Sequence, residues 1–149
     1  ANASSISDGA AALVVTKESV AKAQGLPIAA RVVAWATNSQ EPARFTSAPV
    51  PAIRKVLDKA GWSIDDVDLF EINEAFAMVP MIAMKELGIP AEKLNVNGGA
   101  TALGNPIGAS GARIIATLIA ALENRGLKKG VASLCIGGGE GTAIAVELA

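Results

Sequence analysis

Residues Val131 to Leu148 read VASLCIGGGEGTAIAVEL, two short apolar runs separated by a cluster of glycines. Each run has the length and the apolar content that predict a buried strand. Because a short glycine-rich turn joins strands that lie side by side, we expect the two runs to form an antiparallel pair. The chain upstream alternates strand and helix patterns, which is typical of a layered α/β domain. The sequence therefore predicts a mixed sheet.

The upstream part of the chain adds three strands and four helices. Apolar periodicity and glycine stops predict strands at Ala10–Val15, Ala29–Ala36 and 65–72, and helices at 16–25, 52–61, Asn73–Leu87 and Ala109–Asn124. A further short strand is considered at Leu94–Val96, and the proline-rich residues 38–51 are expected to be a loop. The predicted fold class is α/β, with a mixed five-stranded sheet and helices on both faces.

The predicted helix Ala109–Asn124 is apolar nearly all round, a pattern typical of a helix that is buried on every side. A domain of 149 residues rarely encloses a helix completely. We therefore expect part of the protein outside this chain to cover it.

Composition narrows the function classes. Apolar residues make up 51% of the chain and charged residues 18%, which indicates a globular domain. The net charge is −1 and aromatics are 3%, so a nucleic-acid partner is not expected. The mean hydropathy of +0.41 is high, but the best apolar stretch, Ile114–Leu122, is too short to cross a membrane. One cysteine, no histidine and no visible targeting segment predict a cytoplasmic protein without disulfides or a metal site.

Three polar positions stand out as candidate site residues. Cys135 precedes three glycines at a predicted strand end, where it is either a core thiol or a reactive one facing free backbone N–H groups. A reactive thiol normally needs an adjacent base, usually histidine, and this chain has none. Asn73 is either a helix N-cap or an amide that faces the glycine loops. Asn105 lies at the centre of a second glycine-rich loop, Asn97–Ile114, which matches no phosphate-binding fingerprint.

Four blocks of sequence together resemble the thiolase family. NEAFA (73–77), NVNGGATALGNPIGASGARI (95–114) and CIGGGEGTAIAVE (135–147) are similar to its three C-terminal signature blocks. NASSISDGAAALVV (2–15) resembles the segment that starts its C-terminal domain. The resemblance runs over essentially the whole chain and implies that residues 1–149 are a thiolase C-terminal domain without the N-terminal one.

The resemblance also implies a fold, an activity and partners. Thiolases have two similar domains packed in five layers, with a buried central helix from each. The implied reaction is the reversible condensation of acetyl-CoA to acetoacetyl-CoA, with coenzyme A thioesters as substrates and no further cofactor. The implied partners are the thiolase N-terminal domain and further copies, as a dimer or tetramer. The nucleophilic cysteine belongs to the N-terminal domain, so this chain alone is expected to be inactive.

Residue roles follow from the same resemblance. Cys135 matches the acid/base cysteine, the Gly137 N–H matches part of an oxyanion hole, and Asn73 matches the amide that positions a water. For substrate binding, the resemblance places near the pantetheine arm or the acyl group Ser4, Ala75, Phe76 and Phe45.

Asn105 departs from the family pattern, which has Gly-His-Pro where this chain has Gly104-Asn105-Pro106. An amide donates a hydrogen bond but takes up no proton near neutral pH, so it cannot activate a nucleophile. Related condensing enzymes of fatty-acid synthesis carry asparagine here, but they have histidine where this chain has Asn73. Two explanations stay open: an engineered His→Asn change or a natural variant.

Two other functions compete with this interpretation. The first is a non-catalytic CoA-binding or interaction domain derived from a thiolase, favoured by the missing histidine. The second is a 3-oxoacyl-CoA thiolase that prefers longer acyl chains.

Overall fold

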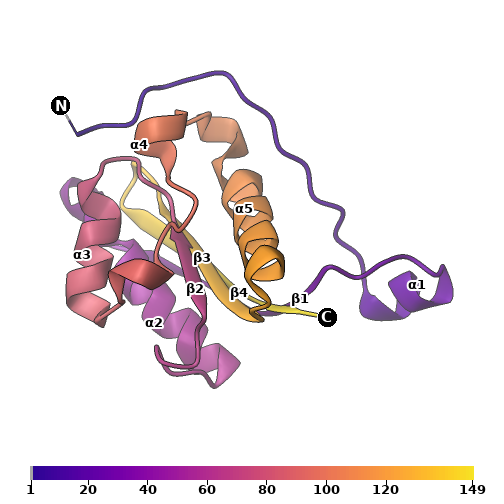
Figure 1. Ribbon diagram of the computed structural model, residues 1–149. Helices are drawn as coiled ribbons and strands as arrows, with labels where there is room; N and C mark the ends of the chain where they lie inside the picture. Colours follow the sequence, from indigo (N-terminus) through magenta and orange to yellow (C-terminus); the bar gives the residue numbers. More distant parts are fainter. Residues whose placement is uncertain (1) are drawn as a thin grey trace.

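The computed structural model describes residues 2–149, so Ala1, where the predicted domain starts, lies outside the described residues. The chain folds into one sheet with helices on both sides (Figure 1). The strands are β1 (Ala30–Ser39), β2 (Leu69–Ile72), β3 (Lys129–Cys135) and β4 (Glu140–Leu148). The α-helices are α1 (Glu18–Ala23), α2 (Pro49–Ala60), α3 (Met78–Leu87), α4 (Ala100–Leu103) and α5 (Ser110–Arg125), and three short 3-10 turns lie at Pro42–Ser47, Ala91–Lys93 and Ile107–Ala109.

The sheet is mixed, as predicted from the glycine turn. Its order is β1-β4-β3-β2. Strands β3 and β4 pair antiparallel around the turn, with Cys135 opposite Gly141, and β4 pairs antiparallel with β1. Strands β2 and β3 are the parallel pair, with Ile72 opposite Ser133. The carboxyl ends of β2 and β3 therefore meet at one edge of the sheet.

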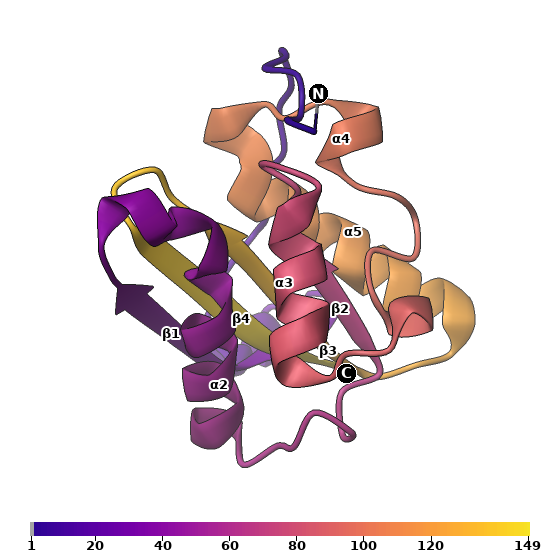
Figure 2. The ribbon, with the colours of Figure 1, turned by 90° about the vertical axis from the view of Figure 1, so that its left-hand side faces the viewer.

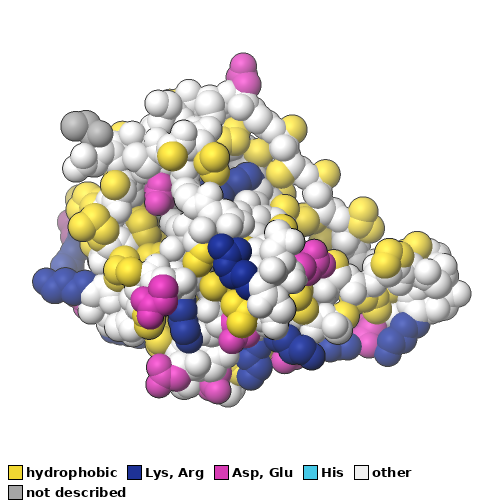
Figure 3. All heavy atoms as spheres, in the orientation of Figure 1, with side chains coloured by type: hydrophobic (Ala, Val, Ile, Leu, Met, Phe, Trp, Pro, Cys, Tyr) yellow, Lys and Arg dark blue, Asp and Glu magenta, His cyan; other side chains and the backbone are white. Residues whose placement is uncertain are grey.

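The prediction of five strands was wrong, because the sheet has four strands among residues 2–149. Ala10–Val15 is not part of the sheet and pairs with no strand among residues 2–149, and the segment crosses over the body toward α1 (Figure 1). Val14 in this segment is 93% exposed. Figure 3 shows further exposed hydrophobic side chains along the course of the N-terminal segment. Leu94–Val96 makes only isolated bridges. An apolar run becomes a strand only where a neighbour accepts its hydrogen bonds, and none of the described residues does so for Ala10–Val15.

Helices cover both faces of the sheet, as predicted. Helices α2 and α3 lie on one face and α5 lies on the other (Figure 2). The first core packs α2 residues such as Ile53 and Val56 against Phe70 and Val131. The second core packs Leu118 and Leu122 of α5 against the opposite face of β2, β3 and β4. Helices α2, α3 and α5 bury apolar side chains against the rest of the domain. Each of the three helices ends at a glycine with a left-handed backbone conformation.

Helix α5 is not buried on every side within this chain. Leu118 and Leu122 are buried, whereas Ala116 and Ala120 on its outer side are exposed. An apolar groove of about 270 Å³ lies between α5 and the strands β3 and β4. Trp35 of β1 borders this groove and is 64% exposed. The all-round apolar pattern thus leaves an uncovered apolar surface on this side of the sheet.

No helix formed by residues 2–149 combines the length and the hydropathy needed to cross a bilayer.

Candidate functional site

Asn73 and Cys135 lie at the carboxyl ends of the parallel strands β2 and β3. The Asn73 N–H donates to the Ser133 carbonyl over 2.9 Å, which continues the β2–β3 ladder by one residue. Cys135 ends β3 two residues further along. Helix α3 begins at Met78, so Asn73 is not its N-cap and its side chain is free for other contacts. The structure thus favours the interpretation of Asn73 as an amide that faces the glycine loops over that of a helix N-cap.

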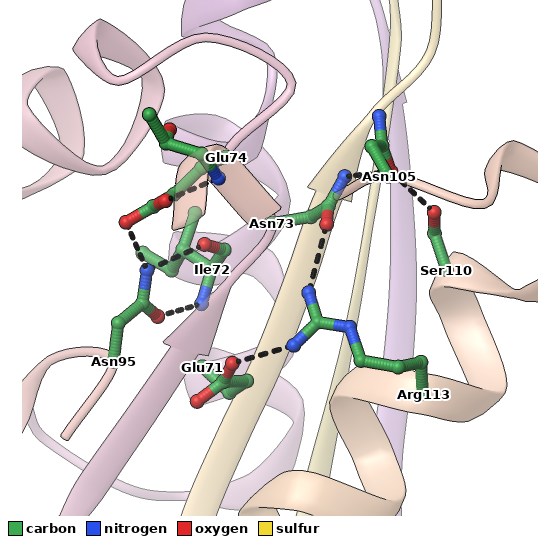
Figure 4. Close-up of polar contacts among 9 residues, drawn as sticks. Glu71, Ile72, Asn73, Glu74, Asn95, Asn105, Ser110 and Arg113 are labelled. Atoms are coloured by element: carbon green, nitrogen blue, oxygen red, sulfur yellow. Dashed lines mark hydrogen bonds and ion pairs between the residues drawn. The ribbon is translucent and has the colours of Figure 1, made fainter. Parts of the chain in front are cut away.

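The structure brings Asn73 and Asn105 together. Asn73 Nδ2 donates to Asn105 Oδ1 over 3.4 Å, and the Ser110 hydroxyl donates to the same oxygen over 2.7 Å (Figure 4). Asn73 is 4% exposed and Asn105 is half-buried. Gly104 adopts a φ of +94°, and a side chain there would collide with Ser7. The glycine loop therefore turns sharply enough to present Asn105 to the end of β2.

A buried ion pair, which the sequence analysis missed, lies behind Asn73. Arg113 of α5 contacts Glu71 of β2 over 3.1 Å and donates to Asn73 Oδ1 over 3.0 Å (Figure 4). The Glu71 side chain is 2% exposed and the Arg113 side chain is 17% exposed. The signal was present in the sequence, because Glu71 lies within an apolar strand and Arg113 directly precedes the apolar run Ile114–Leu122. Buried charges are paired when they occur, and this pair supports the Asn73 amide.

Burial has the largest effect on the pKa of the Glu71 carboxyl. Loss of water raises the pKa of the Glu71 carboxyl to about 7, although the charge and hydrogen bond of Arg113 act in the opposite direction. The negative charge of Glu74 adds a smaller upward contribution. Glu71 therefore titrates close to neutral pH.

A second missed residue, Asn95, fixes the end of β2. Its side chain bonds both backbone groups of Ile72, accepting from N–H over 2.8 Å and donating to C=O over 2.9 Å. Asn95 also donates to Glu74, whose carboxylate accepts from the Thr101 N–H over 2.9 Å. The backbone of Asn95 has a φ of +47°, which asparagine tolerates better than most residues. These contacts join the loop after β2 to the glycine-rich loop that starts α4.

The N-terminal segment, residues 2–7, connects the same two loops. Ser4 donates to the Ala75 carbonyl from its N–H over 3.1 Å and from its hydroxyl over 3.2 Å. The Asn105 N–H donates to the Ser5 carbonyl over 2.8 Å. Ser4 and Ala75, both predicted from the resemblance to bind substrate, are therefore direct neighbours.

The other two predicted substrate residues also meet. The rings of Phe45 and Phe76 pack edge to face with their centroids 6.0 Å apart. Phe45 comes from the 3-10 turn Pro42–Ser47, within the region predicted to be a loop. Phe76 bridges to Ala3 of the N-terminal segment. The four predicted substrate residues thus form one continuous group beside Asn73.

Cys135 and Gly137 lie on the β3 side of the site. Cys135 is half-buried, and burial raises the pKa of its thiol. Among residues 2–149, neither Asn73 nor Asn105 makes a hydrogen bond to Cys135. Gly137 is exposed at the tip of the turn, and a side chain there would meet open space. The turn therefore leaves open space beside the α-carbon of Gly137.

The described residues supply only part of a pocket. A cavity of about 420 Å³ lies between the 3-10 turn Pro42–Ser47 and α3, and none of the predicted site residues lines it. The groove beside Trp35 also excludes them. In the part of the chain that the structure describes, no three His, Cys, Asp or Glu side chains lie close enough to hold a metal ion. The candidate site is thus an open edge of polar and aromatic groups.

Comparisons with known proteins agree with this geometry. The family described as "Thiolase, C-terminal domain" matches residues 26–148. The cytosolic acetyl-CoA acetyltransferase of Mus musculus is 53% identical over 147 residues, which cover 99% of this chain and 37% of that protein. The acetyl-CoA acetyltransferase of Allochromatium vinosum is 54% identical over 146 residues, covering 98% of this chain and 37% of that protein.

A solved structure shows the same architecture. The crystal structure of the Bacillus anthracis acetyl-CoA acetyltransferase superposes with a TM-score of 0.96 at 49% identity, covering 99% of this chain and 38% of that chain. This chain therefore spans well under half the length of the relatives it matches.

Proposed function

This chain belongs to the thiolase family, in which it corresponds to the C-terminal domain, and from that premise we propose that the whole protein is an acetyl-CoA acetyltransferase. The proposed reaction is the reversible condensation of two acetyl-CoA molecules to acetoacetyl-CoA and free coenzyme A. Coenzyme A thioesters are the substrates. The observation that carries the proposal is the contact between Asn73 and Asn105 at the carboxyl edge of the strand pair that ends in Cys135.

We assign the acid/base role to Cys135. In condensation, its thiolate takes a proton from the methyl carbon of acetyl-CoA. The resulting enolate attacks the carbonyl carbon of an acetyl group held as a thioester on a cysteine of the N-terminal domain. The new C–C bond forms, the C–S bond breaks, and its electron pair returns to the cysteine sulfur. A raised pKa favours the protonated thiol, the form that donates the proton in the cleavage direction.

Asn105 and Gly137 act as hydrogen-bond donors to developing negative charge in this proposal. Gly137 is exposed at the tip of the turn with open space beside its α-carbon, which supports a role for its N–H in an oxyanion hole. Asn105 supplies an amide donor but no proton acceptor, so activation of the nucleophilic cysteine is impaired. Loss of a general base lowers the rate by about 10²–10⁴.

The uncovered apolar surfaces support a thiolase N-terminal domain as the partner of this chain. Ala116 and Ala120 of α5, Trp35 and the extended run Ala10–Val15 together leave apolar groups in water. Such patches mark interfaces when they are contiguous. Assembly of the whole protein as a dimer or tetramer in the cytoplasm completes the proposal, and the mouse relative is named cytosolic.

Thiolysis of acetoacetyl-CoA by the purified full-length protein tests the function. We expect slow turnover with Asn105, a gain of about 10²–10⁴ in Asn105→His, and loss of that gain when Cys135→Ser is added. The 149-residue chain alone should be inactive. Absence of thiolysis in full-length Asn105→His, with acetoacetyl-CoA or with longer 3-oxoacyl-CoA substrates, would overturn the proposal.

A second candidate function is the binding of coenzyme A without reaction. The observation that favours it is that the sequence has no histidine to serve as a base. A domain that binds coenzyme A without reacting would show saturable binding in titration calorimetry and no turnover in any of these forms. A preference for longer substrates in the same assay would instead indicate a 3-oxoacyl-CoA thiolase of broader chain length.

A further inference from the structure

Arg113 lies between a buried carboxylate and a buried amide, and the proposed reaction gives it no role. One terminal nitrogen contacts Glu71 Oε1 over 3.1 Å and the other donates to Asn73 Oδ1 over 3.0 Å (Figure 4). Both partners belong to β2 or follow it directly, while Arg113 projects from α5. A planar guanidinium held at one nitrogen by Glu71 has its second nitrogen aimed in a fixed direction.

The chemistry of arginine determines which way the Asn73 amide points. The two ends of an asparagine amide have nearly the same shape, so packing alone does not select between them. A guanidinium is only a donor, so the atom of Asn73 that faces Arg113 must be the oxygen. The Asn73 NH₂ group is then directed at Asn105, 3.4 Å away.

The same logic extends to Asn105. Because a donor faces it from Asn73, the nearest Asn105 atom must be its oxygen, and the Ser110 hydroxyl donates to that oxygen as well. The Asn105 NH₂ group is left on the other side, pointing away from Asn73 (Figure 4). No acceptor for this NH₂ group is found within residues 2–149. It is thus a free donor at the open edge of the site.

We propose that Arg113 is a positioning residue that fixes the direction of a three-residue relay, Arg113 to Asn73 to Asn105, so that Asn105 presents its NH₂ group to the substrate thioester oxygen. This inference rests on the proposed function, since it concerns the same site. Without Arg113 nothing holds the Asn73 oxygen, so the side chain can rotate out of its position and take its NH₂ group away from Asn105. Asn105 is then free to turn, which would present a carbonyl oxygen to the developing oxyanion and repel it.

Crystal structures of full-length variants provide a test that needs no turnover. In Arg113→Met we expect the Asn73 side chain to leave its position, with loss of the 3.4 Å contact to Asn105. Arg113→Lys keeps a charge beside Glu71 but has no planar fork, so we expect the same loss even if Arg113→Met folds poorly. Arg125→Met is the matched control, because Arg125 lies on the same helix and donates to the Asn97 side chain away from the site.

Kinetics separate positioning from a general structural effect. In thiolysis we expect Arg113→Met to lower kcat by about 10- to 100-fold with KM within about twofold, because the aligned donor acts on the transition state. In an Asn73→Ala background, the same change should lower kcat by less than about twofold, because the residue that Arg113 orients is absent.

Two results would overturn the inference: an Asn73 side chain that stays in place in both Arg113 variants, or an equal kcat loss with and without Asn73. Failure of the proposed function would give a different result, in which neither the unmodified protein nor Asn105→His catalyses thiolysis. In that case the crystallographic position of Asn73 still decides whether Arg113 directs the relay.

Discussion

Asn95 replaces a neighbouring strand for Ile72, because its side-chain amide bonds both the N–H and the C=O of that residue over 2.8 and 2.9 Å. Ile72 is the last residue of β2, the edge strand that, within the described residues 2–149, pairs with no strand except β3. One side chain thus completes the hydrogen bonding of a strand end. The residue held next in line is Asn73, so the placement of the site depends on Asn95.

At Asn95, replacement by glycine should destabilise the fold less than replacement by alanine, the reverse of the usual order. Asn95→Ala loses the two bonds to Ile72 and keeps an L residue at a φ of +47°, so we expect a loss of about 3 kcal/mol in the free energy of unfolding. Asn95→Gly loses the bonds without the conformational cost, and it should be the more stable variant by about 1 kcal/mol. Urea unfolding of the two variants measures the difference, and equal stabilities would show that the left-handed backbone costs nothing here.

Glu71 should make stability fall as the pH rises toward neutral. Its pKa is about 7 in the folded chain and 4.5 as the ordinary value, so the folded state holds its proton more tightly. The stabilisation is complete below about pH 4.5 and is lost as the pH rises through about 7, a change of roughly 3 kcal/mol from this group.

Denaturant unfolding between pH 4.5 and 8 measures this dependence, with Glu71→Gln as the comparison. The glutamine variant should lose the downward slope across this interval. A slope that is unchanged in Glu71→Gln would contradict the assignment to Glu71.

The Cys135 thiol should react slowly. Burial raises its pKa, so less thiolate is present at a given pH than in an unfolded chain. We expect alkylation by iodoacetamide to be slower in the folded 149-residue chain than in urea, with its half-maximal rate at a higher pH. Mass spectrometry is unambiguous, because the sequence has one cysteine. A half-maximal pH below that of the unfolded chain would instead indicate a site that stabilises thiolate.

Two glycines of the β3–β4 hairpin should differ in their response to alanine, Gly137 in the turn and Gly141 at the start of β4. A Cβ at Gly141 would collide with the Ala48 carbonyl, where β4 passes the start of α2, so Gly141→Ala should cost roughly 3 kcal/mol or more. A Cβ at Gly137 meets nothing within 4 Å, and Gly137→Ala should change stability by less than about 0.5 kcal/mol. Thermal unfolding of both variants checks the contrast, which fails if the two midpoints move together.

Local patterns predicted the elements whose neighbours lie within this chain. The β3–β4 hairpin follows from its glycine turn, and α2 and α5 follow from apolar periodicity and a terminal glycine. Ala10–Val15 has an equally good strand pattern but no pairing partner among residues 2–149. The apolar periodicity of a segment indicates which of its side chains can be buried. Whether the segment joins a sheet depends on which other strands are available to pair with it.

The candidate site was predictable where a motif carried it. The family resemblance singled out Asn73, Asn105, Ser4, Ala75, Phe76 and Phe45. The structure brings Asn73 into contact with Asn105, Ser4 with Ala75, and Phe45 with Phe76. The supporting residues were missed, because their partners are distant in sequence. Arg113 lies 42 residues from Glu71, and Asn95 lies 23 residues from Ile72. No local pattern encodes either pairing.

The N-terminal segment has a practical consequence for choosing expression boundaries. The family match begins at residue 26, and a truncation there would keep every strand of the sheet. It would also delete Ser4 and Ser5, which join the loop at Ala75 to the loop at Asn105. Such a shortened protein would give a well-dispersed spectrum and a normal melting curve, although it lacks the contacts of Ser4 and Ser5 with the two site loops. Spectra and melting curves alone would therefore not detect that part of the binding site is missing.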